Sequence, residues 1–480
     1  MKRITGLLAA CMLALFIAQP ITYAAETTFS DESIYDLLVD RFNNGLGSND
    51  YDVNAKDPSV FNGGDFAGIS NRLQHILDMQ FTMISVGPVF KTASYDGKQV
   101  LDYSKIEPHF GTTEEFSELI AELHANKLKV MADFPLGGVS ADHVWAKQLP
   151  TIPADQGTID WDVSKTETQD QLIAAAVQFV SDYSVDGIRL TKLDRADTEF
   201  LDKMITALKD AKEGLYVITN QPSNAAFDSM PAEDRSQAIQ DAFVQVDPDS
   251  SALNTFSNDD AGKLLQLDDL TGPRFTYKMV ELRQFPPTRW KIATTAQFML
   301  PGVPLTPYAT EIAVNGKEAP ESHPFFNFKT DMELHDWIGD LNTLRNGSET
   351  LRTGDFTMLH NDDGFIVFER SSEKEKWIIA INNTSELKSF QIDPAQIGEK
   401  KKLRGVLAQD LIKQTKDNEY HIVVERELAE IYLVEDDEGF NTPYLIASLL
   451  VVIIFLLFVF TVIRKGKQNR NNDVVNSSKD

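Results

Sequence analysis

Between residues 33 and 344 the chain alternates short apolar runs with longer stretches in which apolar residues recur at helical spacing. Short apolar runs bounded by turn residues predict buried strands, and the helical recurrence predicts amphipathic helices. The runs that fit a strand are 34–39, 82–86, 129–134, 187–190, 215–219, 242–246, 254–257 and 303–306. Because strands that alternate with helices form parallel sheets, these units predict an α/β fold, a (β/α)8 TIM barrel over residues 26–344.

Two regions depart from this alternation. Residues 139–164 follow the third predicted strand and carry Pro150, Pro153 and Gly157, so we expect a short inserted loop domain there. From residue 345 to residue 434 the pattern changes to apolar runs separated by polar turns, such as Asn382-Asn383. That pattern predicts a separate, antiparallel β-sandwich, followed by an acidic linker at 435–443.

The first residues have the layout of a secretory signal peptide. Lys2 and Arg3 precede an apolar run, and small residues follow at the end of segment 1–25. The single cysteine of the chain, Cys11, lies inside this segment, so we expect no disulfide in the mature protein. Whether Cys11 is lipidated stays open.

The last residues predict a membrane anchor. Residues 444–463 contain no charged side chain and are long enough to cross a bilayer as a helix. A buried core helix of that length would normally show a polar face. Arg464 and Lys465 begin a basic tail, 464–480, which we expect in the cytoplasm. The preceding domains would then lie outside the cell membrane.

The charge of the chain excludes one class of partner. Lys and Arg number 45 and Asp and Glu number 72, which gives a formal net charge of −27. So large a negative charge repels phosphate backbones. We therefore expect no nucleic-acid partner.

Four segments near the ends of predicted strands carry the candidate chemistry: 130–138, 185–191, 216–220 and 253–260. In order and spacing they resemble the signature regions of the α-amylase superfamily, glycoside hydrolase family 13. The resemblance implies an active site at the carboxyl ends of the barrel strands and an α-glucan or oligosaccharide as ligand.

Two positions that the resemblance marks as catalytic have lost their carboxyl groups. Thr191 stands where the family has its nucleophile and Asn220 where it has its general acid, whereas the third carboxylate is matched to Asp260. Retaining glycosidases need two carboxyl groups about 5 Å apart. A hydroxyl without an adjacent base is a poor nucleophile, and an amide cannot deliver a proton. The resemblance also implies sugar-binding roles for Arg189, Asn258 and Asp259.

Other positions depart from the family in the same direction. Gly137 and Gly138 replace an asparagine and a histidine, and Lys98 replaces a sugar-stacking tyrosine. For Arg189 and Asp260 two interpretations stay open: an ion pair at the barrel mouth that only stabilises the fold, or continued sugar binding.

A second candidate site lies near the start of the barrel. Residues 40–50 and 63–65 resemble the calcium loop of cyclodextrin-forming amylases. Calcium prefers six to eight oxygen ligands. The resemblance implies a Ca²⁺ site at Asn44, Asn49, Asp50, Gly63 and Asp65. A solvated turn rich in Asn and Gly is the alternative.

These observations predict a degenerate, membrane-tethered, extracytoplasmic member of the α-amylase family, active in carbohydrate metabolism or α-glucan binding but without ordinary hydrolysis. One alternative is an active α-glucosidic hydrolase or transglycosylase with rearranged catalytic groups. Another is a scaffold ectodomain that supports a membrane-protein partner. Whether the chain is an enzyme is left open by the sequence.

Overall fold

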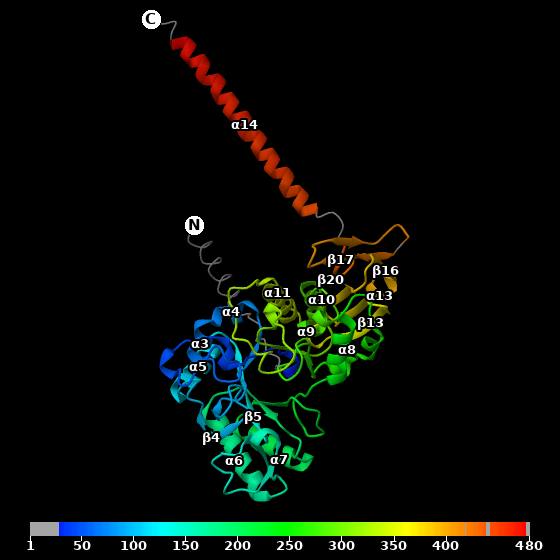
Figure 1. Cartoon of the computed structure of the whole chain (residues 1–480). Helices are drawn as coiled ribbons and strands as arrows, with labels where there is room; N and C mark the ends of the chain where they lie inside the picture. The colour runs from blue at the N-terminus through cyan, green and yellow to red at the C-terminus, as the bar shows by residue number, and fades with distance from the viewer. Residues whose placement is uncertain (1–27, 418, 438–441, 477–480) are drawn as a thin grey trace, which may run out of the picture.

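The computed structural model describes residues 28–417, 419–437 and 442–476. It contains a barrel, a smaller β domain packed beside it, and a long helix that projects from that β domain (Figure 1). The expected signal peptide lies outside the described residues.

The barrel wall is a parallel sheet in the strand order β10-β9-β5-β2-β1-β12-β11. The strands are β1 (Ile34–Asp36), β2 (Met83–Ser85), β5 (Lys129–Pro135), β9 (Gly187–Thr191), β10 (Tyr216–Thr219), β11 (Leu264–Gln266) and β12 (Val303–Pro307). Between β10 and β11 a short segment completes the wall through two parallel bridges, Ile218 to Ser229 and Pro231 to Leu264. The sixth position of the barrel is therefore occupied by only a few residues.

Two of the predicted strands are wrong. Residues 242–246 begin within the last turn of α8 (Glu233–Phe243), which buries Ala238, Ile239, Ala242 and Phe243 at helical spacing. Residues 254–257 overlap the 3-10 helix η4 (Ser251–Thr255). A short apolar run does not by itself distinguish a buried strand from a buried helix face. The seventh strand is β11, ten residues later than expected.

The helices cover the outside of the sheet. They are α2 (Val39–Phe42), α3 (Phe66–Asn71), α4 (Leu73–Asp78), α5 (Thr113–Ala125), α6 (Thr166–Asp182), α7 (Thr198–Ala211), α8, α9 (Phe275–Glu281), α10 (Pro286–Met299), α11 (Glu333–Gly347) and α12 (Glu349–Thr353). Helix α5 begins with a capping box in which Thr112 and Glu115 satisfy each other's backbone N–H groups.

Two small sheets rise from the barrel. A hairpin of β3 (Phe90–Thr92) and β4 (Val100–Ile106) follows β2. After β5 the chain forms an antiparallel sheet in the order β6-β8-β7, built from β6 (Val139–Ser140), β7 (Thr151–Pro153) and β8 (Thr158–Trp161). This second sheet occupies the region in which the sequence predicted an inserted loop domain.

The C-terminal domain is antiparallel. Six strands form one sheet in the order β13-β14-β15-β20-β17-β18: β13 (Asp355–Asp362), β14 (Phe365–Ser371), β15 (Lys376–Asn382), β17 (Lys401–Gly405), β18 (Leu411–Lys413) and β20 (Leu428–Asp436). A second sheet pairs β16 (Lys388–Ile392) with β19 (Tyr420–Val424), and α13 (Pro394–Ile397) lies between β16 and β17 in the chain. Apolar side chains from both sheets share one core, including Val367, Ile378, Tyr420 and Ile422.

The last element is the helix α14 (Thr442–Asn476), which extends away from the barrel (Figure 1). Its segment Tyr444–Gly466 has a mean hydropathy of 3.3, and none of its most apolar window is buried against the rest of the protein. By length and composition alone, this segment is able to cross a membrane.

Candidate functional site

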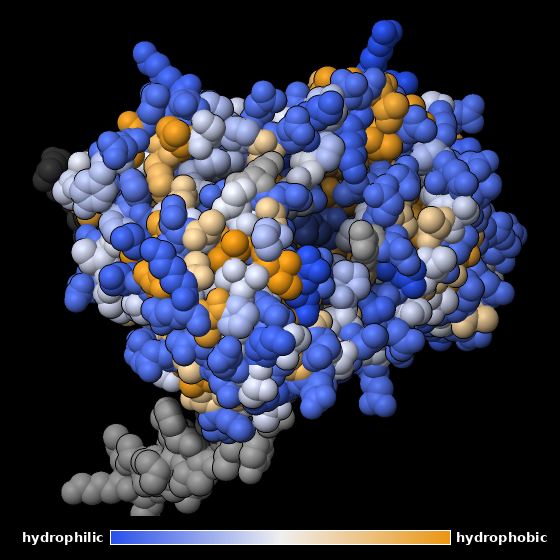
Figure 2. Space-filling model, turned by 60° about the horizontal axis from the view of Figure 1, so that its bottom comes forward, coloured by the Kyte–Doolittle hydropathy of each residue, from blue (hydrophilic) through white to orange (hydrophobic). Residues whose placement is uncertain are grey.

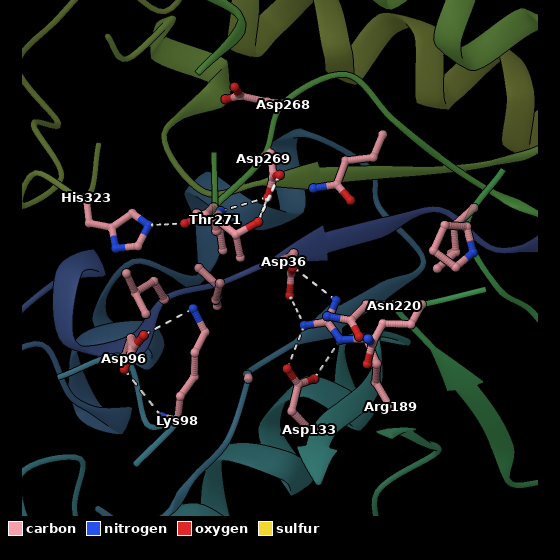
Figure 3. A pocket seen from close by; sticks show the side chains of 18 of the residues that line it. Asp36, Asp96, Lys98, Asp133, Arg189, Asn220, Asp268, Asp269, Thr271 and His323 are labelled. Atoms are coloured by element: carbon pink, nitrogen blue, oxygen red, sulfur yellow. Dashed lines mark hydrogen bonds and ion pairs between the residues drawn. The ribbon is translucent and has the colours of Figure 1, made fainter. Parts of the chain in front are cut away.

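A pocket of about 480 Å³ lies at the carboxyl ends of the barrel strands. Asp36, Asp133, Arg189 and Asn220 line it from the ends of β1, β5, β9 and β10, and Asp268 and Asp269 line it from just beyond β11 (Figure 3). Figure 2 shows a face of the molecule that is mostly hydrophilic and hollowed near its centre. The pocket therefore occupies the end of the barrel where parallel-strand barrels carry their active sites.

A buried ion-pair network forms the floor of the pocket. Arg189 donates to both carboxylate oxygens of Asp133, at 2.8 and 2.9 Å, and to both of Asp36, at 2.9 and 3.0 Å. Its remaining contact is the Ser85 hydroxyl, at 3.3 Å. Since the strand register places Asp133 beside Arg189, the network follows directly from the parallel sheet. One guanidinium group is consequently shared by two carboxylates.

Burial sets the electrostatics of this floor. Burial raises the pKa of the Asp133 carboxyl, although the charge of Arg189 opposes that effect. Burial also acts to lower the pKa of Arg189, but the carboxylates of Asp133 and Asp36 outweigh it and hold this pKa above its usual value. Arg189 therefore stays charged and keeps both acids engaged.

The carboxyl groups after β11 differ in how they are used. Asp268 is fully buried, pairs with Arg274 at 2.8 Å and accepts the Thr310 hydroxyl at 2.8 Å. Asp269 is half-buried and accepts only the backbone N–H and hydroxyl of Thr271, the shorter contacts being 2.7 and 2.8 Å. Asp269 is thus a pocket carboxylate without a basic partner among the described residues.

The two positions that the family resemblance assigned to the nucleophile and the acid lie at neighbouring strand ends. Asn220 is exposed in the pocket, directly after β10, and Thr191 is the last residue of β9 and is buried. Gln221 ties the two strand ends together: its Oε1 accepts the backbone N–H of Leu193 at 2.7 Å, and its Nε2 donates to Asp194 at 3.2 Å. At these two strand ends the described pocket is lined by Arg189, Asn220, Gln221 and Pro222, none of which is acidic.

Asp260 does not lie at the mouth of the barrel. It belongs to the 3-10 helix η5 (Asn258–Asp260), which precedes β11 and so sits at the opposite, amino-terminal end of that strand. There it is buried and pairs with Arg235 at 2.9 Å and Lys263 at 3.3 Å. Of the two interpretations left open for Arg189 and Asp260, an ion pair between them at the barrel mouth is therefore wrong, and Asp260 is not among the residues that line the described pocket.

The two residues before Asp260 are also remote from the pocket. Asn258 contacts the C-terminal domain, where it accepts the backbone N–H of Phe356 at 2.7 Å and lies 3.3 Å from a carboxylate oxygen of Asp355. Asp259 is exposed. Neither is placed to bind a sugar in the pocket. Asp268 and Asp269, which follow β11, occupy the part of the mouth that the sequence assigned to Asp259 and Asp260.

Gly137 and Gly138, which follow β5, leave room for the Asp160 side chain of the inserted sheet. Gly138 donates its N–H to Asp160 at 2.9 Å, and Arg195 lies 3.4 Å from the other oxygen of that carboxylate. A Cβ atom at position 137 would come within 2.7 Å of Asp160. Glycine at 137 therefore lets Asp160 fasten the inserted sheet to the loop after β9.

Part of the candidate calcium loop suits a cation. Asn49 donates through Nδ2 to the carbonyl of His109 at 2.8 Å and to Asp65 at 3.3 Å. This orientation leaves its buried Oδ1 without a hydrogen-bond partner. Such an unsatisfied acceptor is a fitting ligand for Ca²⁺. The exposed side chains of Asn44 and Asp50 lie together beside Gly63, with Asn44 donating to Asp50 at 2.9 Å.

The fifth residue of that set has another role. Asp65 caps α3 by accepting the N–H of Gly68 at 2.6 Å, and it also accepts the N–H groups of Gly45 and Leu46, each at 2.9 Å. With Asn49 its carboxylate has four donors. The oxygens that remain for a cation come from Asn44, Asn49, Asp50 and the Gly63 carbonyl.

Comparisons with known proteins agree with this architecture. Residues 36–182 match the α-amylase catalytic domain, and residues 354–432 match the α-amylase C-terminal domain. An Anoxybacillus α-amylase is 32% identical with a TM-score of 0.80, covering 86% of this chain and 100% of that one. The α-amylase of Geobacillus thermoleovorans, solved with acarbose, is 30% identical with a TM-score of 0.79 and the same coverage. A cyclomaltodextrinase from Thermoanaerobacter pseudethanolicus is 24% identical over 420 residues, 77% of this chain and 73% of that protein.

The chain therefore belongs to the α-amylase family, glycoside hydrolase family 13. Within that family, the pocket at the carboxyl end of the barrel is the site to which the chemistry must be assigned.

The pocket residues that the sequence analysis missed include Asp36, Gln266, Asp268, Asp269 and Lys278. A usable signal existed for Asp268 and Asp269, because they directly follow the leucine-rich run 264–267, as acids at a strand end would. Lys278 lies on a helix, and nothing in the sequence indicates that it reaches the pocket.

Proposed function

We propose that the protein binds α-glucan oligosaccharides in the barrel pocket without hydrolysing them at the rate of a conventional family member. The observation that carries this proposal is the occupancy of two neighbouring strand ends by Thr191 and Asn220. Glycoside hydrolysis with retention needs a nucleophile and a proton donor there.

The other carboxyl groups of the pocket do not supply the missing pair. Asp36 and Asp133 are held by Arg189, and Asp268 is held by Arg274. Asp96 pairs with Lys98 at 3.1 Å. Asp269 alone among these five lacks a basic partner, and one carboxylate cannot act both as nucleophile and as acid in the same step. It can still accept hydrogen bonds from sugar hydroxyls.

The class of ligand is suggested by the relatives. They include α-amylases, one of them bound to acarbose, and a cyclomaltodextrinase. An active hydrolase is the second candidate, favoured by the fact that these relatives are named as enzymes.

We further propose that α14 anchors the protein in a membrane, with the barrel on the extracytoplasmic side. The uncharged segment and the basic residues Arg464 and Lys465 that follow it support this arrangement. Proteolysis of intact cells tests it, because a barrel on the outer side is cleaved and a barrel on the inner side is protected.

A calcium ion at Asn44, Asn49, Asp50 and Gly63 is also proposed, as a structural ion with no part in the binding of sugar. Its support is the unpartnered Oδ1 of Asn49.

The decisive experiment measures binding and turnover on the same samples of the full-length protein in detergent. Calorimetry with maltotetraose and product analysis after long incubation are compared for the native protein and Asp269→Asn. We expect binding without product, and about tenfold weaker binding for Asp269→Asn, as for loss of a charged hydrogen-bond acceptor. Product that disappears in Asp269→Asn would instead establish an active hydrolase.

A further inference from the structure

Three basic side chains line the pocket, and they differ in their partners. Arg189 is bound by Asp36 and Asp133, and Lys98 is paired with Asp96. Lys278, on α9, makes no ion pair with any described acidic residue. Its Nζ donates instead to the side-chain oxygen of Gln240 on α8. Lys278 is thus the one lining cation of the described pocket whose charge no carboxylate neutralises.

Several polar, uncharged side chains line the part of the pocket to which Lys278 belongs. The sixth position of the barrel wall consists of two bridges, at Ser229 and Pro231, and the pocket extends to this part of the wall. Its lining here comes from Pro231, Ser236, Gln237, Gln240, Leu264 and Gln266 together with Lys278. The Ser236 hydroxyl accepts the backbone N–H of Gln266 at 3.0 Å. The side-chain amide of Gln266 makes no hydrogen bond to a described residue.

These groups have unused donors. An ammonium group carries three N–H bonds, and Gln240 takes one of them, so two remain. The side-chain amide of Gln266 can donate two hydrogen bonds and the hydroxyl of Ser236 can donate one. Ammonium donors form short, strong hydrogen bonds with carboxylate and phosphate oxygens. Neutral sugar hydroxyls need no such charge, since amides and one carboxylate already suffice to bind them.

The net charge of the whole protein disfavours anion binding, in contrast to the local charge of Lys278. A formal charge of −27 repels anions over most of the surface. Within the pocket, Asp269, which follows β11, has no basic partner among the described residues, and Lys278, on α9, has no acidic one. A ligand that carries both hydroxyl groups and an anionic group would complement these two side chains.

We propose that the physiological ligand is an oligosaccharide that carries an anionic substituent, and that Lys278, with Gln266 and Ser236, binds this substituent. The proposal rests on the sugar-binding role of the pocket. A uronate and a sugar phosphate offer the same chemistry, and the experiment separates them.

The test is calorimetry on the full-length protein with three probes: maltotetraose, maltotetraose ending in glucuronate, and maltotetraose phosphorylated on its terminal glucose. We expect at least one anionic probe to bind about tenfold more tightly than the neutral one, as for one charge-assisted hydrogen-bonded contact. Added salt should narrow this difference. The probe with the larger gain identifies the anionic group.

Three variants separate ligand binding from a structural role of the lysine. Lys278→Met should bind all three probes equally, at the affinity of the neutral one, and Lys278→Arg should keep the preference. The exposed residue Lys329 provides the matched control, Lys329→Met, which should behave as the native protein.

Two results would overturn the inference while leaving the proposed function intact: equal affinity of the native protein for all three probes, or an equal loss of all three in Lys278→Met. The second result would mean that Lys278 only stabilises the packing of α9 against α8, through its hydrogen bond to Gln240. Failure of every probe to bind would overturn the proposed function itself, and this inference with it.

Discussion

Two sides of the same pocket are built in opposite ways. The side formed by β1, β2, β5 and β9 is a continuous parallel ladder whose charges are buried in one network, with Arg189 bound between Asp36 and Asp133. On the side formed by β11, α8 and α9, the barrel wall is reduced to two parallel bridges. Here the Lys278 ammonium group has no acidic partner among the described residues and donates to the Gln240 amide instead. The first side has little freedom to change without loss of stability, whereas the second can vary at small cost. Ligand preference is therefore expected to reside on the second side.

The largest effect should come from restoring the lost acids where the two sides meet. In Thr191→Asp combined with Asn220→Glu, the intact Arg189 side should support catalysis again, with hydrolysis of maltotetraose on the order of 10³-fold above the native protein, because catalytic groups of hydrolases contribute factors of this size or more. Product analysis measures the gain. Each single variant is the control and should remain inactive, since both groups are needed. An inactive double variant with a native circular dichroism spectrum would contradict the assignment of these positions.

The second-largest effect is a difference in protein stability between substitutions on the two sides of the pocket. Arg189→Met leaves two buried carboxylates without their partner and should reduce the free energy of unfolding by about 3–5 kcal/mol. Lys278→Met removes one hydrogen bond at a half-buried site and should cost about 1 kcal/mol or less. Denaturant unfolding followed by tryptophan fluorescence compares them. Equal losses would show that the two sides do not differ as described.

The rim of the pocket should respond to acid. Burial lowers the pKa of His323 to about 4, and the neutral ring is satisfied by the Tyr95 hydroxyl at 2.9 Å and the Leu270 carbonyl at 2.6 Å. The unfolded chain takes up a proton on this histidine below about 6.5, and the folded protein does so only near 4, so stability falls as pH decreases through that window. At pH 5 this amounts to about 2 kcal/mol for one such group.

Comparison with His323→Gln isolates that contribution in melting curves between pH 7 and 4.5. The variant keeps a donor and an acceptor but cannot be protonated, so its melting temperature should fall less steeply with acid. Asp40, whose pKa burial raises to about 6, acts in the opposite direction but is common to both proteins. Parallel curves for the two proteins would contradict the role given to His323.

The smallest expected effect concerns the candidate calcium loop, which lies outside both sides of the pocket. Calcium at tenfold excess over its Kd should stabilise the native protein by about 1.4 kcal/mol through mass action. The melting temperature should rise with added calcium and fall with a chelator. Asn49→Leu removes the unpartnered oxygen and should abolish the response. A calcium response that survives in this variant would place the ion elsewhere.

Much of the fold could be predicted from periodicity. Six of the eight strand assignments overlap observed strands, since apolar runs such as 129–134 and 303–306 are bounded by clear turns. The C-terminal domain was evident from its alternating runs. The sixth and seventh strands were misplaced because Ala242–Phe243 is apolar on a helix face, whereas the true sixth segment is too short to leave a periodic signal.

The candidate site was predicted less well. Arg189, Thr191 and Asn220 lie within or directly after β9 and β10, because residues 187–190 and 215–219 were recognisable as strands. Asp260 was placed at the wrong end of the barrel, because the seventh strand was predicted ten residues too early in the chain. That Arg189 would be bound to Asp36 rather than to Asp260 depends on the closure of the barrel, which brings together residues that are 153 positions apart on β1 and β9.

The sequence alone determined the class of the fold, the apolar C-terminal helix and the presence of threonine at position 191 and asparagine at position 220, because these depend on residue identity and on local periodicity. Only the tertiary structure decided which charges neutralise one another, because pairing depends on strand order and register. It therefore also decided that Asp269 is left without a basic partner and Lys278 without an acidic one.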